Sequence, residues 1–269
     1  MPFVTLGSLI NFCDCLMAGG TSRKDHSEVG SSYIHFNFTP NQDKATASLI
    51  GDVPRGVMLN QRPIFLGGQG GLVGPCRLGF GITVAAGTII RKDEPRSDRL
   101  IFGGVGKGGN VPYAPGNFLT GKKIIINNII YIANLIALTH WYQKVRRLFV
   151  AKRFPEALLN GLNEKVTLAV AERINRLEAV CLKKSEAGWS ELKGFLNGQL
   201  TNPGDAKSMD TFLESIHKGI AARGKDYIGV IQGLEPADSD SGTRWLQGIV
   251  DHIAAEAVRV MPALSGDRT

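Results

Sequence analysis

Cysteine is scarce in this chain, and the spacing of the few cysteines matches no metal site or disulfide pattern. The four cysteines among 269 residues, Cys13, Cys15, Cys76 and Cys181, show neither the spacing of a metal site nor that of a disulfide framework. Cys13 and Cys15 fall on the same face of one short strand, where a direct bridge is disfavoured. We therefore expect no bound metal, and a reducing, cytoplasmic environment.

Signals for export, membrane insertion and nucleic-acid binding are also missing. The first 20 residues lack a basic start and are interrupted by polar residues, so they do not match a signal peptide. The most apolar segment, residues 124–138, contains three asparagines and is too short to span a bilayer, so we expect a buried helix. No basic run is interleaved with aromatic residues, which argues against nucleic acid. The net charge of +7 suits either an anionic small molecule such as a nucleotide or CoA, or an ordinary basic enzyme.

A six-residue period is the strongest pattern that is present. Leu66, Leu72, Leu78, Val84 and Ile90 recur at this interval, with mostly Gly and Ala between them. The period fits neither a helix nor a simple alternating strand. It is typical of a solenoid whose coils have three flat sides, each side a short strand with one aliphatic side chain pointing inward.

The same spacing begins near the N-terminus, where Val4, Ile10 and Leu16 are six residues apart. A stack of coils needs covered ends, because an open end exposes apolar side chains and strand edges. We therefore expect either that this chain is a fragment or that something else caps its first coil. The polar residues 22–48 interrupt the period, as loops inserted between coils do.

Beyond residue 93 the composition changes twice. Residues 94–121 are rich in Gly, Pro and charge, and we interpret them as a linker or extended loop. They include Gly104-x-Gly106-x-x-Gly109, but no βαβ setting surrounds it, so we assign no dinucleotide site. Residues 122–269 carry apolar residues at helical spacing and predict an α-helical domain of about five helices, separated at segments such as Pro236. The predicted order is a β-solenoid (1–93), a linker (94–121) and an α-helical domain (122–269).

Residues 64–93, IFLGGQGGLVGPCRLGFGITVAAGTIIRKD, resemble the hexapeptide-repeat acyltransferases of bacteria. The resemblance is greatest to the C-terminal half of the bifunctional N-acetylglucosamine-1-phosphate uridyltransferase / glucosamine-1-phosphate acetyltransferase, a UDP-N-acetylglucosamine pyrophosphorylase. Upstream, Asn37-Phe38, Lys44 and Ile50-Gly51-Asp52 resemble that family's Asn-Tyr, Lys and Ile-Gly-Asp segment. The resemblance covers about residues 1–93, and it implies a left-handed parallel β-helix and a homotrimer. The left hand comes from the family alone, because parallel crossovers are usually right-handed.

Two features depart from that family. Its members carry a nucleotidyltransferase domain with a glycine-rich nucleotide signature, which is absent here, so this chain alone is not expected to make a sugar nucleotide. Residues 53–62, VPRGVMLNQR, are an insertion relative to the family. We expect this insertion either to reshape the acceptor pocket or to contact a neighbouring subunit.

The resemblance also implies a catalytic base. His26, in Ser-Arg-Lys-Asp-His-Ser, resembles the family's histidine that takes a proton from a sugar amine as the amine attacks acetyl-CoA. The alternative is a loop histidine among charged neighbours. His35 is the runner-up: its alternation with Ile34 and Phe36 is compatible with an outward side chain, but the favoured interpretation is a structural histidine with a satisfied hydrogen bond.

By the same resemblance, Asn37, Phe38 and Lys44 bind the acceptor, and the backbone at Gly68 and Ala86 lines the groove for acetyl-CoA or another acyl-CoA. Phe38 lacks the hydroxyl of the family's tyrosine. Losing such a hydrogen-bond donor in a pocket for a polar sugar can change the selectivity between acceptor substrates by large factors. Lys44 pairs with a phosphate in one interpretation and is a solvated loop charge in the other.

Two functions remain open from the sequence. The first is acyl-CoA-dependent N-acyl transfer to a sugar phosphate or sugar nucleotide, with His26 as base. The second is a non-catalytic oligomerisation tail of a sugar-1-phosphate nucleotidyltransferase-related protein. The long helical half, which the family lacks, favours the second function or a divergent substrate.

Overall fold

The computed structural model describes residues 4–6, 15–22, 24–36, 46–103, 121–183 and 187–264. These residues divide into two compact units, each described here by itself. Unit 1 comprises residues 1–52 and 60–131, and unit 2 comprises residues 53–59 and 132–269. The division therefore falls inside helix α2 (Gly121–His140), whereas composition placed the boundary in the Gly/Pro-rich residues 94–121. A change in composition marks where the type of secondary structure changes along the chain, but packing decides which residues form one compact unit.

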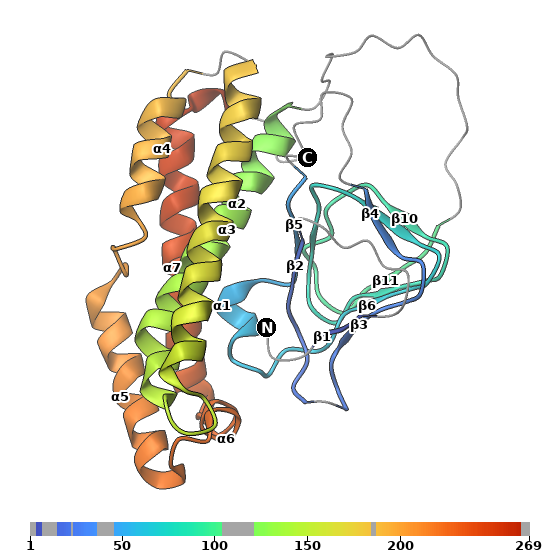
Figure 1. Cartoon of the computed structure of the whole chain (residues 1–269). Coiled ribbons are helices and arrows are strands. Elements are labelled where there is room, and N and C mark those ends of the chain that lie inside the picture. Colours follow the sequence, from blue (N-terminus) through green and yellow to red (C-terminus); the bar gives the residue numbers. More distant parts are fainter. Residues whose placement is uncertain are drawn as a thin grey trace, which may run out of the picture. The chain divides into compact units, whose positions relative to one another are not determined.

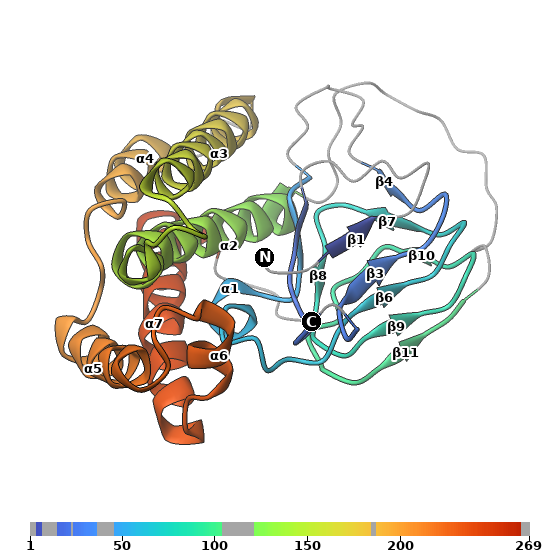
Figure 2. The ribbon, with the colours of Figure 1, turned by 60° about the horizontal axis from the view of Figure 1, so that its bottom comes forward.

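Unit 1 contains short parallel strands in three small sheets (Figures 1 and 2). The first sheet has the order β1 (Val4–Leu6), β3 (Ser27–Val29), β6 (Phe65–Leu66), β9 (Thr83–Val84) and β11 (Leu100–Ile101). The second has the order β10 (Ile89–Ile90), β7 (Gly71–Val73) and β4 (Ile34–Phe36). The third has the order β2 (Cys15–Met17), β5 (Ser48–Ile50) and β8 (Arg77–Leu78).

The predicted fold class, a left-handed β-helix followed by a helical domain, is wrong: such a solenoid is not evident in the described residues, where helices hold more residues than strands. A regular solenoid needs a constant sequence distance between paired strands. That distance is equal for Leu66–Val84 and Leu72–Ile90, but it about doubles for Val29–Leu66. Insertions between the strands therefore break the repeat outside residues 64–93.

The five hexad residues are nevertheless buried, as predicted. Leu66, Leu72 and Val84 have no exposed surface, and Leu78 and Ile90 are at most 5% exposed. They belong to one hydrophobic cluster that takes residues from all three sheets. An aliphatic residue before a Gly- or Ala-rich corner thus predicts burial even where the larger fold is not predicted.

Unit 2 is built from helices (Figure 1). They are α1 (Val53–Gly56), the C-terminal part of α2 with its extensions Trp141–Val145 and Arg146–Phe149, α3 (Glu156–Lys183), α4 (Trp189–Gly198), α5 (Ala206–Arg223), α6 (Tyr227–Gln232), α7 (Pro236–Val260) and the short turn Pro262–Leu264. Pro236, expected to separate helices, is instead the first residue of α7, where its missing N–H costs nothing. Asp205 begins α5 by accepting hydrogen bonds from the backbone N–H of Lys207 and Ser208.

Residues 53–59 of the insertion belong to the helical unit, whereas its last residue, Arg62, belongs to unit 1 and lines a cavity there. The backbone N–H of Val53 donates to Asn134 Oδ1 at 2.9 Å, and Met58 and Leu59 are buried. Burying these apolar side chains explains why the insertion folds onto helices instead of remaining a loop.

The most apolar segment, residues 124–138, is a buried helix, as predicted. One helix, residues 122–149, is long and apolar enough to cross a membrane by length and composition. However, 83% of the 18-residue window that passes this test is buried in the structure, and the core helices of soluble proteins pass the same test.

Candidate functional site

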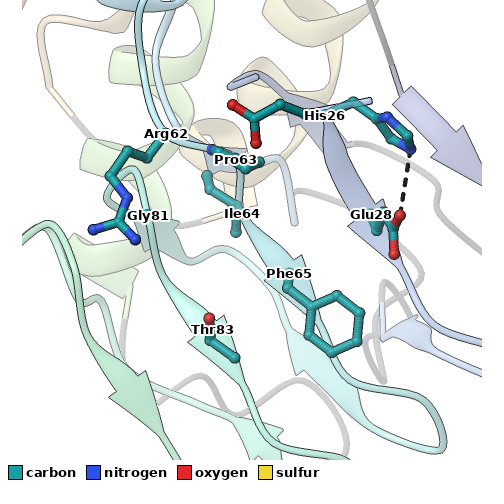
Figure 3. A pocket seen from close by; sticks show the side chains of 9 residues that line it. His26, Glu28, Arg62, Pro63, Ile64, Phe65, Gly81 and Thr83 are labelled. Atoms are coloured by element: carbon teal, nitrogen blue, oxygen red, sulfur yellow. Dashed lines mark ion pairs between the residues drawn. The ribbon is translucent and has the colours of Figure 1, made fainter. Parts of the chain in front are cut away.

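A cavity of about 330 Å³ lies against the first sheet of unit 1, and His26 lines it (Figure 3). Strands β3, β6 and β9 each contribute one outward side chain to it, because Glu28, Phe65 and Thr83 occupy successive positions of the parallel register. The full set of lining residues is Asp25, His26, Glu28, Arg62, Pro63, Ile64, Phe65, Gly81 and Thr83.

A tight turn holds His26 at the start of β3. Residue Gly20 pairs with His26 in an isolated antiparallel bridge, and its φ of +101° lies in the region that glycine tolerates best. A Cβ atom on Gly20 would lie 2.6 Å from the Cα of His26, so only glycine permits this approach. The Ser22 side chain accepts hydrogen bonds from the backbone N–H of Lys24 and Asp25, which closes the turn.

The imidazole of His26 pairs with a carboxylate. Its Nε2 lies 3.3 Å from Glu28 Oε1, and the histidine side chain is 17% exposed whereas the glutamate is 50% exposed. The two side chains lie on the same face of the strand because they are two residues apart. Among the described residues, His26 Nδ1 has no hydrogen-bond partner and is fully enclosed. A proton therefore reaches this pair from the Nε2 side, where Glu28 lies.

Arg62 contributes a positive charge to the cavity. Its Nη1 lies 2.9 Å from Asp98 Oδ1 in an exposed ion pair, with side chains 74% and 54% exposed. Such a pair is weak in water, so Asp98 holds Arg62 only loosely. The guanidinium can therefore turn towards an anionic group in the cavity at little cost.

His35, the runner-up base, is a structural residue. It is fully buried, and its Nε2 lies 2.9 Å from the Ser48 hydroxyl. The favoured interpretation of a structural histidine is therefore confirmed, and the outward orientation is wrong: Ile34 and Phe36 are about 40% exposed, and the histidine between them points inward. A Cβ on Gly74 would lie 2.6 Å from Nε2, so no room for a substrate exists at this nitrogen.

The structure brings Gly68 and Ala86 together at one corner. The backbone N–H of Gly87 donates to the carbonyl of Gly68 at 3.0 Å, and a Cβ on Gly67 would lie 2.5 Å from the nitrogen of Ala86. This corner follows β6 and β9, the strands whose first residues, Phe65 and Thr83, line the cavity. The cavity and the corner are therefore at the two ends of one strand pair. The other predicted ligands, Asn37, Phe38 and Lys44, lie outside the described residues.

Sequence reasoning missed Glu28 and Thr83 as cavity residues, whereas Arg62 lies in the insertion 53–62, for which a role in the acceptor pocket was one of two expectations. The signal for Glu28 was its position two residues after His26, between the buried Ser27 and Val29. Thr83 could have been found from the hexad pattern, because it immediately precedes an inward residue and so points outward. Within the described residues, no group of three or more His, Cys, Asp or Glu side chains is placed to hold a metal ion.

Comparison with known proteins found no match. No family model, no curated protein and no solved structure matches it.

Proposed function

We propose that the chain transfers an acyl group from acyl-CoA to the amine of a sugar phosphate or sugar nucleotide. The observation that carries the proposal is the His26–Glu28 pair, with Nε2 and Oε1 3.3 Å apart, on the wall of a cavity. An imidazole can change its protonation near neutral pH, and a carboxylate partner orients it and stabilises its cation. Arg62 in the same cavity supplies a positive charge for the acceptor's phosphate.

In the proposed reaction, the lone pair of the amine attacks the thioester carbonyl carbon, and the C–S bond breaks. The amine proton passes to the His26–Glu28 pair, and the pair returns it to the departing thiolate. The products are an N-acyl amine and the CoA thiol, and the pair ends in its starting state. Because Nδ1 is enclosed, we assign the base role to the pair: Glu28 either receives the proton or holds the imidazolium once Nε2 has it.

We place the acyl-CoA along the corner formed by Gly68 and Ala86. Gly68 lies three positions after Phe65, a span of about 10 Å in an extended strand. The amine in the cavity reacts only with a thioester carbon about 3–3.5 Å from it. We therefore place the nucleotide end of acyl-CoA at the corner, with the arm that carries the thioester extending along β6 and β9 into the cavity.

The test is acyl transfer from acetyl-CoA to amino-sugar phosphates, with the N-acetyl product measured by mass spectrometry. His26→Gln and Glu28→Gln are each expected to lower turnover about a hundred-fold or more. His217→Gln, which changes an exposed histidine on α5, is the matched control and is expected to act like the native chain. Native turnover in both His26→Gln and Glu28→Gln would remove the cavity from the mechanism.

A non-catalytic oligomerisation module is the second candidate, and exposed apolar side chains favour it. Phe65, Leu100 and Phe102 are 41%, 62% and 74% exposed on or just after strands of the first sheet. Such side chains are usual at contacts between subunits. A homotrimer in sedimentation, combined with no thermal shift from acetyl-CoA, would favour this function. A ligand that binds the folded chain adds about 2.7 kcal/mol to the free energy of unfolding when it is present at a hundred times its Kd.

A further inference from the structure

A second charged site lies in unit 2, at the end of the long apolar helix. Five cations gather there, which we call the basic turn: Arg146, Arg147, Lys152, Arg153 and Lys225. Backbone structure and one hydrogen bond bring them together. Arg146 and Arg147 begin the turn Arg146–Phe149, an antiparallel bridge joins Ala151 to Phe154 with Lys152 and Arg153 at its tip, and Lys225 Nζ donates to the carbonyl of Val150 at 2.8 Å.

Arg146 is held by aromatic rings. Its Cζ lies 3.8 Å from the ring centroid of Tyr227 and 4.1 Å from that of Phe154. Tyr227 is itself fixed, because Trp141 Nε1 donates to its hydroxyl at 3.1 Å and Phe149 meets it edge-on at 5.1 Å. Burial raises the pKa of Tyr227 to about 12, so the phenol is neutral and does not cancel the charge of Arg146.

No carboxylate neutralises this guanidinium within the part of the chain that the structure describes. Arg146 forms no ion pair or side-chain hydrogen bond there, and burial lowers its pKa. Arg146 is half-buried and none of its side-chain nitrogens is fully enclosed, so its N–H edge reaches the surface. Ring contacts fix the plane of a guanidinium and leave its fork of donors free, which is the arrangement suited to a phosphate or carboxylate.

Helix stabilisation alone does not account for the basic turn. Cations near a helix C-terminus offset the helix dipole, and Lys225 does so at the carbonyl of Val150. Lys152 and Arg153, however, are exposed and sit on a turn after the last helical residue. The preceding residues Trp141–Val145 form a π-helical turn, a feature found often at functional sites.

We propose that the basic turn binds a phosphate group, with Arg146 as its fixed bidentate donor and Lys152 and Arg153 as flexible cations around it. A phosphate dianion matches this set better than a carboxylate, because it offers more acceptor oxygens and more charge to several cations. The phosphate belongs either to a soluble phosphoester or to a lipid headgroup. The site is separate from the cavity in unit 1, so neither proposal depends on the other.

The experiment titrates the full chain with inorganic pyrophosphate by isothermal calorimetry at low salt. Arg146→Gln is expected to weaken binding about tenfold or more, because it removes charged hydrogen bonds. Arg146→Lys keeps the charge but loses the planar fork, so it is expected to bind between the native chain and Arg146→Gln. Arg176→Gln is the matched control: it removes the same charge on α3, where Glu172 already pairs with it.

Equal binding by Arg146→Lys and the native chain, or equal losses in Arg146→Gln and Arg176→Gln, would overturn the proposal. If Arg146→Gln does not fold, the exposed double variant Lys152→Gln, Arg153→Gln must weaken pyrophosphate binding, and native affinity there also overturns it. A parallel arm uses phosphatidylcholine vesicles with and without phosphatidylserine. Binding to the anionic vesicles that pyrophosphate displaces supports a headgroup as the source. Binding to the vesicles without any pyrophosphate binding overturns the phosphate site in favour of a diffuse anionic surface.

Discussion

Replacing Gly67 by alanine tests the corner on which the proposed acyl-CoA groove depends. A Cβ there would lie 2.5 Å from the nitrogen of Ala86, 2.5 Å from the carbonyl oxygen of Val84 and 2.6 Å from the carbonyl carbon of Ala85. All three are backbone atoms, which cannot rotate away as a flexible side chain can. Overpacking of this kind costs about 1–3 kcal/mol, and the rigid partners place Gly67→Ala at the upper end, about 3 kcal/mol.

Two other glycines separate this clash from general effects of losing a glycine. Gly87 has a φ of +73° but no atom within 4 Å of an added Cβ, so Gly87→Ala is expected to cost only the strain of a left-handed residue, about 1–2 kcal/mol. Gly103 has open space and no positive φ, so Gly103→Ala is expected to be nearly neutral. The predicted order of destabilisation is Gly67→Ala, then Gly87→Ala, then Gly103→Ala.

The measurement must report on unit 1 alone. All three tryptophans, Trp141, Trp189 and Trp245, lie in unit 2, so tryptophan fluorescence does not follow unit 1. Amide hydrogen exchange of peptides covering residues 64–90 does follow it, because the backbone bonds from Gly67 to Val84 and from Gly87 to Gly68 lie there. If Gly67→Ala exchanges as slowly as Gly103→Ala, the close stacking at this corner is refuted.

Three further predictions address other parts of the chain. Burial lowers the pKa of His140 below that of an ordinary histidine, so unit 2 is most stable above the pKa of the unfolded chain's histidine and loses stability as the pH falls below it. The free energy of unfolding of His140→Gln, followed by tryptophan fluorescence, is therefore expected to depend less on pH in that range. Asp205→Ala removes the N-cap of α5 and is expected to cost about 1 kcal/mol in urea unfolding followed by fluorescence. His35→Ala leaves a cavity beside Ser48 and is expected to speed amide hydrogen exchange in unit 1 by the equivalent of about 2–4 kcal/mol. Lower acyl-transfer activity in this variant with unchanged exchange would contradict the structural role of His35.

Local burial could be predicted from the sequence, but strand pairing could not. Leu66, Leu78 and Val84 are each followed directly by Gly or Ala and are buried, and that pattern depends only on neighbours in the chain. Pairing depends on where the intervening segments fold. Residues 53–59 interrupt the strands and pack in the helical unit, and nothing in their length or composition says so.

The candidate site was predictable only in part, for two different reasons. His26 was found through a resemblance, whereas the motifs on which that resemblance rests assign no role to Glu28. His35 was assigned the wrong orientation because Ile34 and Phe36 were assumed to point inward. Apolar residues are often exposed, so the size of a neighbour does not fix the face of a strand; a buried polar side chain with a partner, here Ser48, does.

The basic turn could not be predicted from the sequence, for a third reason. The residues Lys144, Arg146 and Arg147 fit the usual basic end of a helix, and the sequence gives no sign that Arg146 differs from its neighbours. Arg146 is distinguished by its contacts with the ring of Phe154, which follows it by eight residues, and with the ring of Tyr227, which comes from a distant part of the chain. Only tertiary contacts separate a helix-stabilising cation from a fixed anion ligand.

The two functions proposed for unit 1 compete for one surface. Phe65 lines the cavity beside His26 and is also one of the exposed apolar side chains that favour a subunit contact. The register explains this double position, because Glu28, Phe65, Thr83 and Leu100 follow one another across the outer face of the first sheet. Leu100 pairs with Thr83, which lines the cavity, so a partner that covers Leu100 lies next to the cavity's edge. Acyl transfer and oligomeric state must therefore be measured on the same sample across protein concentration: turnover per chain that rises with assembly places the active site at the contact, and turnover that falls means that assembly closes it.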